Sequence, residues 1–348
     1  MIGYVEFPTW LRPEIIPGLP IRWYGLMYLV AFAITYRLFV HLAVKRGELQ
    51  IDKDAALSLF FWGIVGVLLG GRLFSVLIYD PTGFYARNPL QIVFPFQRVD
   101  GALRFIGLQG MAYHGGLVGA VVAVVVYCRV KRLPVLHVAD LLAASAPLGY
   151  TFGRLGNFIN GELYGRVTSS PLGMVFPAAP GYPTSEPWVR QVAEEAGLPI
   201  AEGAALVNLP RYPSQLFEAF FEGVFLWALL WFVFRGRRPF PGFLLSMYVI
   251  GYGAARFAVE YLREPDEGMG FPLSFVPVAN PALFSPWNFT TGQLLSAAMI
   301  ICGLATLMIL ASHQSTGQRR PGRQRSGGEA ERANARRAML RRMRKKLR

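Results

Sequence analysis

Seven long apolar segments run through most of this 348-residue chain, and they constrain its fold more than any other feature. A helix that crosses the roughly 30 Å hydrocarbon core of a bilayer needs about 20 mostly apolar residues. Only 16% of the residues are charged, whereas soluble domains carry roughly 25%. We therefore expect an all-α polytopic membrane protein with seven transmembrane helices. The predicted spans are Trp23–Val44, Ala55–Ile78, Met111–Cys128, Val135–Leu155, Gln215–Phe234, Gly242–Leu262 and Thr291–Ala311.

Basic residues follow alternate spans, and this pattern predicts the orientation of the chain. They follow the first, third, fifth and seventh spans, whereas the longer connections 79–110, 156–214 and 263–290 are rich in Pro, Gly and aromatic residues. Because short basic loops stay in the cytoplasm, we expect an extracytoplasmic N-terminus and a cytoplasmic C-terminus. We also expect a membrane domain over residues 1–311, in which segment 156–214 forms a small extracytoplasmic head.

The net charge of +14 is concentrated at the C-terminus. Residues 319–348 hold 13 Lys and Arg and two Glu, so this segment carries +11 of the total. A nearly neutral body with a basic tail fits the anionic cytoplasmic leaflet of a bilayer and does not indicate a nucleic-acid enzyme. We expect the tail, residues 312–348, to be either disordered or a helix on the membrane surface.

The cysteines and the N-terminus do not change this prediction. Cys128 and Cys302 are too few for a metal site or a disulfide framework, and we interpret both as small buried apolar residues. The segment Met1–Pro20 has no positive region followed by an apolar run. We therefore expect no cleaved signal peptide, and we expect the first span to be retained.

Polar side chains gather at the predicted outer ends of six spans. An ionisable residue within a span costs roughly 2.5–3.5 kcal/mol on insertion scales, so each needs a partner or a function. Tyr252, Arg256 and Glu260 are four residues apart and therefore share one helix face. We infer a polar cavity that opens toward the outer leaflet. Its other candidate members are Tyr24, Tyr28, Arg72, His114, Arg154, Asn157, Glu162, Gly165, Glu218, Glu222 and Arg263.

A structural interpretation of the same residues stays open. Arg256 and Glu260 can form an ion pair within one helix, and Glu218 and Glu222 can pair with arginines only to hold helices together. The glycines beside them can be positions of close helix packing. The polar residues near the inner ends, interpreted as structural or interfacial, are Arg37, His137 and Asp140.

In their order and spacing these residues resemble the prolipoprotein diacylglyceryl transferase family. The resemblance covers about residues 7–311, and its most specific element is Gly-Arg-Leu-Gly-Asn-Phe-Ile-Asn-Gly-Glu at 153–162. The chain departs from the family at Tyr212, where some members have a histidine, and in its Arg-rich tail. A catalytic histidine at position 212 is therefore not available. The supporting blocks are Trp23–Met27, Leu69–Arg72, His114–Gly116, Pro213–Leu216 and Gly251–Arg256.

The resemblance implies a reaction, its partners and a location. In this family the diacylglyceryl group of phosphatidylglycerol passes to the lipobox cysteine thiol of a prolipoprotein. A thioether forms and glycerol phosphate leaves, which is the first step of bacterial lipoprotein maturation. The resemblance also implies seven spans, an extracytoplasmic head, no metal or other cofactor, and residence in the bacterial cytoplasmic (inner) membrane.

The chemistry of this reaction assigns candidate roles. A thiol with a pKa of about 8.5 needs a base or a positive field to form thiolate, and His114 is the candidate general base, with binding as the alternative. Arg154 and Arg256 are the candidates for a clamp on the leaving phosphate, because a guanidinium is planar and always charged. For Arg72 a structural role is an equal alternative. The candidate substrate-binding and supporting residues are Tyr24, Arg72, Asn157, Glu162 (expected to hold an arginine), Gly165, Tyr252 and Glu260.

Two other functions would use arginines at membrane depth. A lipid or anion transporter usually has pseudo-symmetric halves and broken helices near the midplane, and neither pattern is visible here. A membrane phosphatase or phosphotransferase would need a cluster of metal-binding Asp residues or a His/Arg phosphatase motif, but the Asp residues are scattered. The sequence therefore favours the transferase.

Overall fold

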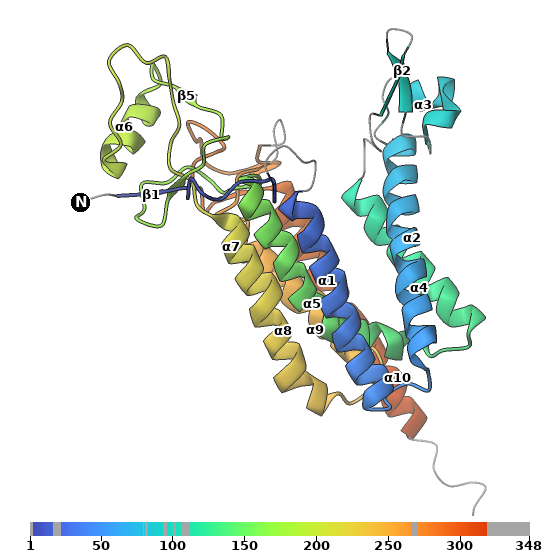
Figure 1. Cartoon of the computed structure of the whole chain (residues 1–348). Coiled ribbons are helices and arrows are strands. Elements are labelled where there is room, and N and C mark those ends of the chain that lie inside the picture. The colour runs from blue at the N-terminus through green and yellow to red at the C-terminus, as the bar shows by residue number, and fades with distance from the viewer. Residues whose placement is uncertain are drawn as a thin grey trace, which may run out of the picture.

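The computed structural model is a bundle of long helices that carries small strands and loops at one end (Figure 1). The N-terminal strand β1 (Val5–Glu6) and the segment that follows α5 (Val135–Asn160) lie at that end, and α10 (Thr291–Gln318) finishes at the opposite end. The residues that the structure describes are 3–16, 22–78, 80, 83–92, 96–99, 102–105, 112–265 and 270–318.

Six of the described helices are long and apolar enough to cross a membrane, so the chain is a multi-pass membrane protein. The predicted sixth span coincides with α9 (Phe243–Val259), which is apolar but has only 17 residues. The length criterion therefore supports six of the seven predicted spans. The six are α1 with η1 (Trp23–Val40, His41–Lys45), α2 (Lys53–Ile78), α4 (Tyr113–Val130), α5, the run from α7 to η5 (Ser214–Arg237) and α10.

The fifth span is not a uniform α-helix. It consists of α7 (Ser214–Glu218), the π-helical η3 (Ala219–Phe225), α8 (Leu226–Ala228), the π-helical η4 (Leu229–Phe234) and a final 3₁₀ turn, η5 (Arg235–Arg237). A π-helix is wider than an α-helix and changes which side chains share a face. The change begins directly after Glu218, a residue of the candidate site.

The ends of two helices differ from the prediction. The predicted fourth span ends at Leu155, but α5 continues to Asn160 even though it contains Pro147. The predicted tail begins at Ser312, but α10 is helical as far as Gln318. The rest of that tail, 319–348, and Met111 at the predicted start of the third span lie outside the described residues.

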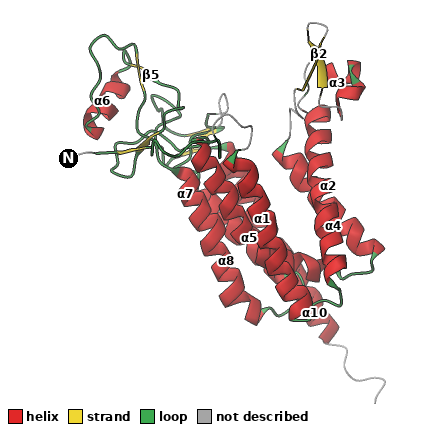
Figure 2. Ribbon diagram, in the orientation of Figure 1, coloured by secondary structure: helices red, strands yellow, loops and turns green. Residues whose placement is uncertain are grey.

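Short strand pairs, which the sequence did not predict, lie outside the long helices (Figure 2). The parallel pair β1–β4 joins Val5 to Met174 and so ties the N-terminal segment to the segment after α5. In that segment, the amphipathic helix α6 (Pro187–Ala196) buries Val189 and Ala193. The other described elements are α3 (Phe84–Arg87), η2 (Pro89–Ile92), β4 (Met174–Val175) and the antiparallel pairs β2–β3 (Phe96–Val99, Ala102–Phe105), β5–β6 (Tyr182–Pro183, Leu206–Val207) and β7–β8 (Leu273–Ser274, Asn288–Phe289).

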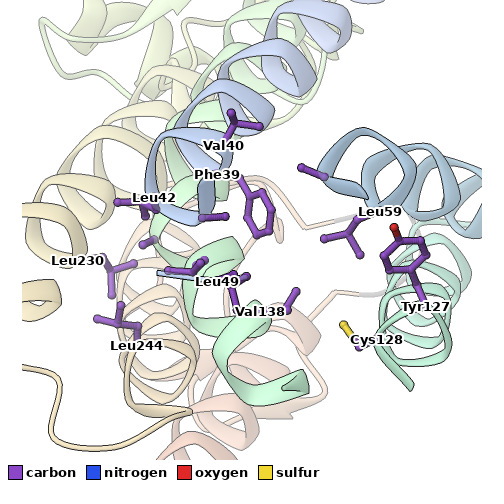
Figure 3. Close-up of a cluster of buried hydrophobic side chains, with 14 of the residues drawn as sticks. Phe39, Val40, Leu42, Leu49, Leu59, Tyr127, Cys128, Val138, Leu230 and Leu244 are labelled. Atoms are coloured by element: carbon purple, nitrogen blue, oxygen red, sulfur yellow. The ribbon is translucent and has the colours of Figure 1, made fainter. Parts of the chain in front are cut away.

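The main apolar core lies at the end of the bundle away from β1 (Figure 3). Phe39 of α1, Leu141 of α5 and Leu244 of α9 are all fully buried there. Cys128 is buried in the same core, as predicted, but Cys302 is exposed on α10, so the expected burial of Cys302 is wrong. An apolar thiol on the outside of a long apolar helix is compatible with a lipid environment.

Helices α2 and α4 form a pair that packs through glycine. An added Cβ at Gly119 would overlap the carbonyl oxygen of Gly66, and one at Gly70 would overlap the carbonyl oxygen of Gly115. The two backbones therefore touch directly, as small residues at four-residue spacing allow in membranes. For these glycines the close-packing interpretation is confirmed. At its upper end in Figure 1 the pair stands apart from the other helices.

Candidate active site

Arg154 and Arg256 meet at one buried carboxylate. Arg154 lies on α5, Arg256 on α9, and Glu218 is the last residue of α7. The Nε of Arg154 is 2.8 Å and the Nη1 of Arg256 is 3.2 Å from the same Oε2 of Glu218, whose side chain has no exposed surface. The two arginine side chains keep 17% and 13% of their surface exposed. Two guanidinium groups from separate helices are thus fixed side by side, and both remain partly accessible.

Two further glutamates and a third arginine complete this arrangement. The Nη2 of Arg256 is 2.7 Å from the Oε2 of Glu260, and its Nη1 is 3.6 Å from the Oε1 of Glu222. Arg263 lies 3.8 Å from Glu218 and 3.9 Å from Glu260. The three arginines and the three glutamates carry equal and opposite charge, which limits the free-energy cost of burying them. We call the following six residues the ionic cluster: Arg154, Arg256, Arg263, Glu218, Glu222 and Glu260.

Tyr150 joins two members of the ionic cluster and was missed by the sequence analysis. Its hydroxyl donates to the Oε2 of Glu222 at 2.5 Å and accepts from the Nε of Arg154 at 2.6 Å. The ring of Tyr252, a predicted site residue, packs edge-on against the Tyr150 ring at 5.9 Å between centroids. The sequence could have predicted this residue, because Tyr150 precedes Arg154 by one helical turn and therefore shares its helix face.

Close contact between α5 and η3 brings Tyr150 and Arg154 to the glutamates. A Cβ at Gly223 would overlap the hydroxyl of Thr151, and that hydroxyl donates to the carbonyl oxygen of Ala219 at 3.2 Å. The two helices can therefore approach at the first turns of η3. Any larger residue at position 223 would collide with Thr151 of α5.

The loop after α5 fixes Asn157 and Gly165 beside the cluster. The Nδ2 of Asn157 donates to the Oε1 of Glu162 at 3.0 Å, and Gln215 donates to the Glu162 carbonyl at 2.7 Å. A Cβ at Gly165 would overlap the carbonyl oxygen of Leu262, so the loop passes directly over the end of α9. Among the described ion pairs none joins Glu162 to an arginine, and its carboxylate instead orients Asn157.

Tyr24 lies on the first turn of α1, next to α5. Its hydroxyl is 3.0 Å from the hydroxyl of Tyr28, and their rings are 4.8 Å apart. Gly156 of α5 packs against Tyr24, since a Cβ there would be 3.5 Å from the Tyr24 Cα. The two tyrosines therefore lie at the same end of the bundle as Asn157 and the loop that follows α5.

Two predicted site residues belong to the α2–α4 pair instead of the ionic cluster. His114 is exposed near the start of α4, and its ring is 5.7 Å from that of Tyr113. Within the described residues no hydrogen bond or ion pair links His114 to the cluster. The Nε of Arg72 donates to the carbonyl of Ile92 at 2.7 Å, and its guanidinium lies over the ring of Tyr85. These contacts of Arg72 fit the structural alternative.

The comparison with known families agrees with this geometry. The model of the prolipoprotein diacylglyceryl transferase family matches residues 13–309. The chain belongs to this family. The resemblance inferred from the motif at 153–162 is therefore confirmed.

Similar members of the transferase family come from several bacteria. The chain is 48% identical over 338 residues to the phosphatidylglycerol–prolipoprotein diacylglyceryl transferase of Treponema denticola, and 46% identical over 332 residues to that of Treponema pallidum. It is 40% identical over 313 residues to that of Chlorobaculum tepidum. These matches cover 92%, 92% and 87% of this chain and 99%, 99% and 94% of the relatives.

Proposed function

We propose that this protein transfers the diacylglyceryl group of phosphatidylglycerol to the lipobox cysteine thiol of prolipoproteins. The observation that carries the proposal is the pair of guanidinium groups held on Glu218. A planar guanidinium matches the oxygens of a phosphate and keeps its charge inside a membrane. Arg154 and Arg256 would bind the phosphate of the lipid and stabilise the negative charge that develops on it.

The proposed step balances as a displacement at carbon. The sulfur of the prolipoprotein cysteine attacks the glyceryl carbon that bears the phosphate, and a carbon–sulfur bond forms. The carbon–oxygen bond breaks, its electron pair passes to the phosphate oxygen, and glycerol phosphate leaves. The thiol proton passes to His114, directly or through water, and the basicity of imidazole near neutral pH supports this role. Since the thiol belongs to the partner, the enzyme needs no nucleophile of its own.

The remaining candidate residues would bind or support the lipid. Asn157, held by Glu162, would donate to the headgroup, and Tyr252 would donate to a phosphate or ester oxygen. Tyr24 would line the lipid entrance, and Gly165 would hold the loop after α5 against the end of α9. Arg72 would support the short helices α3 and η2, and its second candidate role is direct contact with substrate.

The proposed location is the bacterial cytoplasmic (inner) membrane, with α9 as the sixth of seven spans. In the membrane domain of residues 1–311, the head at 156–214 and the N-terminus would face outward and the C-terminus would face the cytoplasm. This orientation is supported by the basic loops and by the β1–β4 pair, which ties the N-terminal segment to the head. A cysteine introduced at exposed Glu202 should react with an impermeant thiol reagent in intact spheroplasts, and labelling only after lysis would contradict the orientation.

The main test is a lipidation assay. The protein is placed in phosphatidylglycerol vesicles with a lipobox peptide, and both the lipidated peptide and glycerol phosphate are measured. The lipidation rate of Arg154→Ala should be about 10²–10³-fold lower than that of the parent protein. The reason is that one hydrogen-bond donor to the oxygen that becomes negatively charged is removed. Arg129→Ala, at an exposed position at the far end of α4, is the matched control and should be unaffected. Near-parent turnover by Arg154→Ala would refute the clamp, and glycerol phosphate release without a thiol peptide would favour hydrolysis of the lipid headgroup over transfer to a thiol.

The role of His114 needs a separate measurement. If His114 is the general base, the acid limb of the pH profile of kcat/KM should disappear in His114→Gln. If it only binds the lipid, the profile should keep its shape while the KM for phosphatidylglycerol rises.

A further inference from the structure

The carboxylate of Glu260 lies against the beginning of α10. This helix begins at Thr291, well after the residues of the ionic cluster in the chain. The hydroxyl of Thr290 donates to the Oε1 of Glu260 at 3.1 Å. Both residues are only 2% exposed. The other oxygen, Oε2, is 2.7 Å from the Nη2 of Arg256. One carboxylate thus connects the start of α10 to a candidate phosphate-binding arginine.

The direction of the Thr290 hydroxyl is fixed by the cap of α10. The backbone N–H of Gln293 donates to the Thr290 hydroxyl oxygen at 3.2 Å, and the backbone N–H of Thr290 donates to the Gln293 side-chain oxygen at 3.0 Å. This is the reciprocal arrangement of a capping box. A hydroxyl has one hydrogen to donate, and because its oxygen accepts from Gln293, that hydrogen is available for Glu260.

Gly292 makes the space that the carboxylate occupies. A Cβ on Gly292 would lie 2.5 Å from the Oε1 of Glu260, which is closer than real Cβ atoms approach a neighbouring atom, and 3.0 Å from its Oε2. Glycine in the first turn of a helix costs stability relative to alanine. Its presence here is explained by the position of the Glu260 side chain.

The electrostatics of the two helix ends also favour this placement. Glu260 follows the last residue of α9, where the negative end of the helix dipole disfavours a carboxylate. The positive end of α10 lies against the same side chain and offsets that effect. Among the described residues, the other ion-pair partners of Glu260 are Arg256 and the more distant Arg263.

We propose that Thr290 and Gly292 are positioning residues of the transferase. They hold Glu260 in one orientation, and Glu260 in turn aims the Arg256 guanidinium at the phosphate of the lipid. This inference rests on the proposed function, because it assumes that Arg256 binds that phosphate.

Three variants separate positioning from stability of the α10 cap. Gly292→Ala improves helix propensity but displaces the Glu260 carboxylate. Thr290→Asp keeps an acceptor for the Gln293 N–H but removes the donor and adds a like charge beside Glu260. Thr290→Ser keeps both hydrogen bonds. Gly63→Ala is the matched control, because that helical glycine of α2 has no atom within 4 Å of an added Cβ.

The measurement is kcat and KM for both substrates in the vesicle assay, together with the folded fraction of each variant. Gly292→Ala and Thr290→Asp should lower kcat/KM for phosphatidylglycerol by about 10–100-fold, because a displacement of the Arg256 guanidinium by about 1 Å has an effect of this size. The KM for the lipobox peptide should stay unchanged. Thr290→Ser and Gly63→Ala should behave like the parent protein.

Two outcomes would overturn the inference. Either both variants keep the parent kcat/KM for the lipid, or their loss is fully explained by a smaller folded fraction with both KM values unchanged. A failure of the proposed function looks different, since the parent protein itself would then not lipidate the peptide.

Discussion

Two helix junctions in this protein are held together by different kinds of contact. Helices α2 and α4 touch backbone to backbone through Gly66, Gly70, Gly115 and Gly119. Helices α5, α7 and α9 meet instead at the ionic cluster, around the fully buried Glu218. In lipid there is no hydrophobic force between apolar helices, so their association depends on close packing or on polar contacts. Only the second kind leaves functional groups at the junction.

The candidate site residues are divided between these two junctions. The ionic junction holds the candidate phosphate-binding arginines rigidly, whereas the glycine junction carries His114 on a helix pair that stands apart at its upper end (Figure 1). The candidate anion clamp and the candidate base therefore belong to different junctions, although α2 and α4 share the main apolar core with α1, α5 and α9 at the other end of the bundle. In the proposed reaction, the lipid and the peptide would have to bind between these two junctions.

Breaking the ionic junction should have the largest effect. Glu218→Ala leaves the guanidinium groups of Arg154 and Arg256 without their shared counter-charge, and loss of one partner of a buried pair costs about 3–5 kcal/mol. The free energy of unfolding in detergent should fall by that amount, and lipidation should be lost. Glu202→Ala, at an exposed position, is the control. Parent-like stability of Glu218→Ala would mean that the cluster does not hold the helices together.

Breaking the glycine junction should cost less. Gly119→Ala forces α2 and α4 apart, because the new Cβ overlaps the Gly66 carbonyl oxygen. Overpacking of this kind costs about 1–3 kcal/mol. Unfolding measurements should detect this loss, while Gly63→Ala should be neutral or slightly stabilising. If both substitutions behave alike, backbone contact is not what holds this pair.

A third substitution tests whether the ionic junction depends on the opposite end of the bundle. The carboxylate of Asp140 accepts hydrogen bonds from the backbone N–H groups of Gly242 and Leu245 at 2.8 and 2.9 Å, so Asp140 has a structural role at the start of α9. Asp140→Ala should lower the free energy of unfolding by about 0.5–2 kcal/mol. The kcat of the folded protein should stay unchanged, and a parallel fall in kcat would show that the two ends are coupled.

The smallest effect is expected outside both junctions. Burial raises the pKa of Tyr182 in the proposed head to about 12, and its hydroxyl donates to Glu264, which also pairs with Arg211. The pKa in the unfolded chain is about 10, so the unfolded state releases its proton first. This contribution to stability is therefore complete below pH 10 and is lost as pH rises to about 12. Tyr182→Phe should show a weaker decrease in stability over that interval, and an unchanged decrease would contradict the assignment.

The sequence predicted the parts of the site that local periodicity controls. Apolar length predicted the helices, and four-residue spacing put Tyr252, Arg256 and Glu260 on one face of α9, where Arg256 and Glu260 are paired. The same rule applied to α5 would have found Tyr150. It could not decide between a structural and a functional role for Arg72, because its contacts Tyr85 and Ile92 lie in α3 and η2, which are too short to show a periodic pattern.

Sequence alone determined that this chain is a polytopic helical membrane protein and that its arginines belong to the transferase motif, because composition and spacing are properties of short segments. Only the tertiary structure decided that Arg154 and Arg256 share Glu218, and that Thr290, directly before α10, contacts Glu260. Those contacts depend on how closely helices from distant parts of the chain approach. That approach is set by side-chain size at positions such as Gly223 and Gly292, where an added Cβ would collide with the Thr151 hydroxyl and with the Glu260 carboxylate.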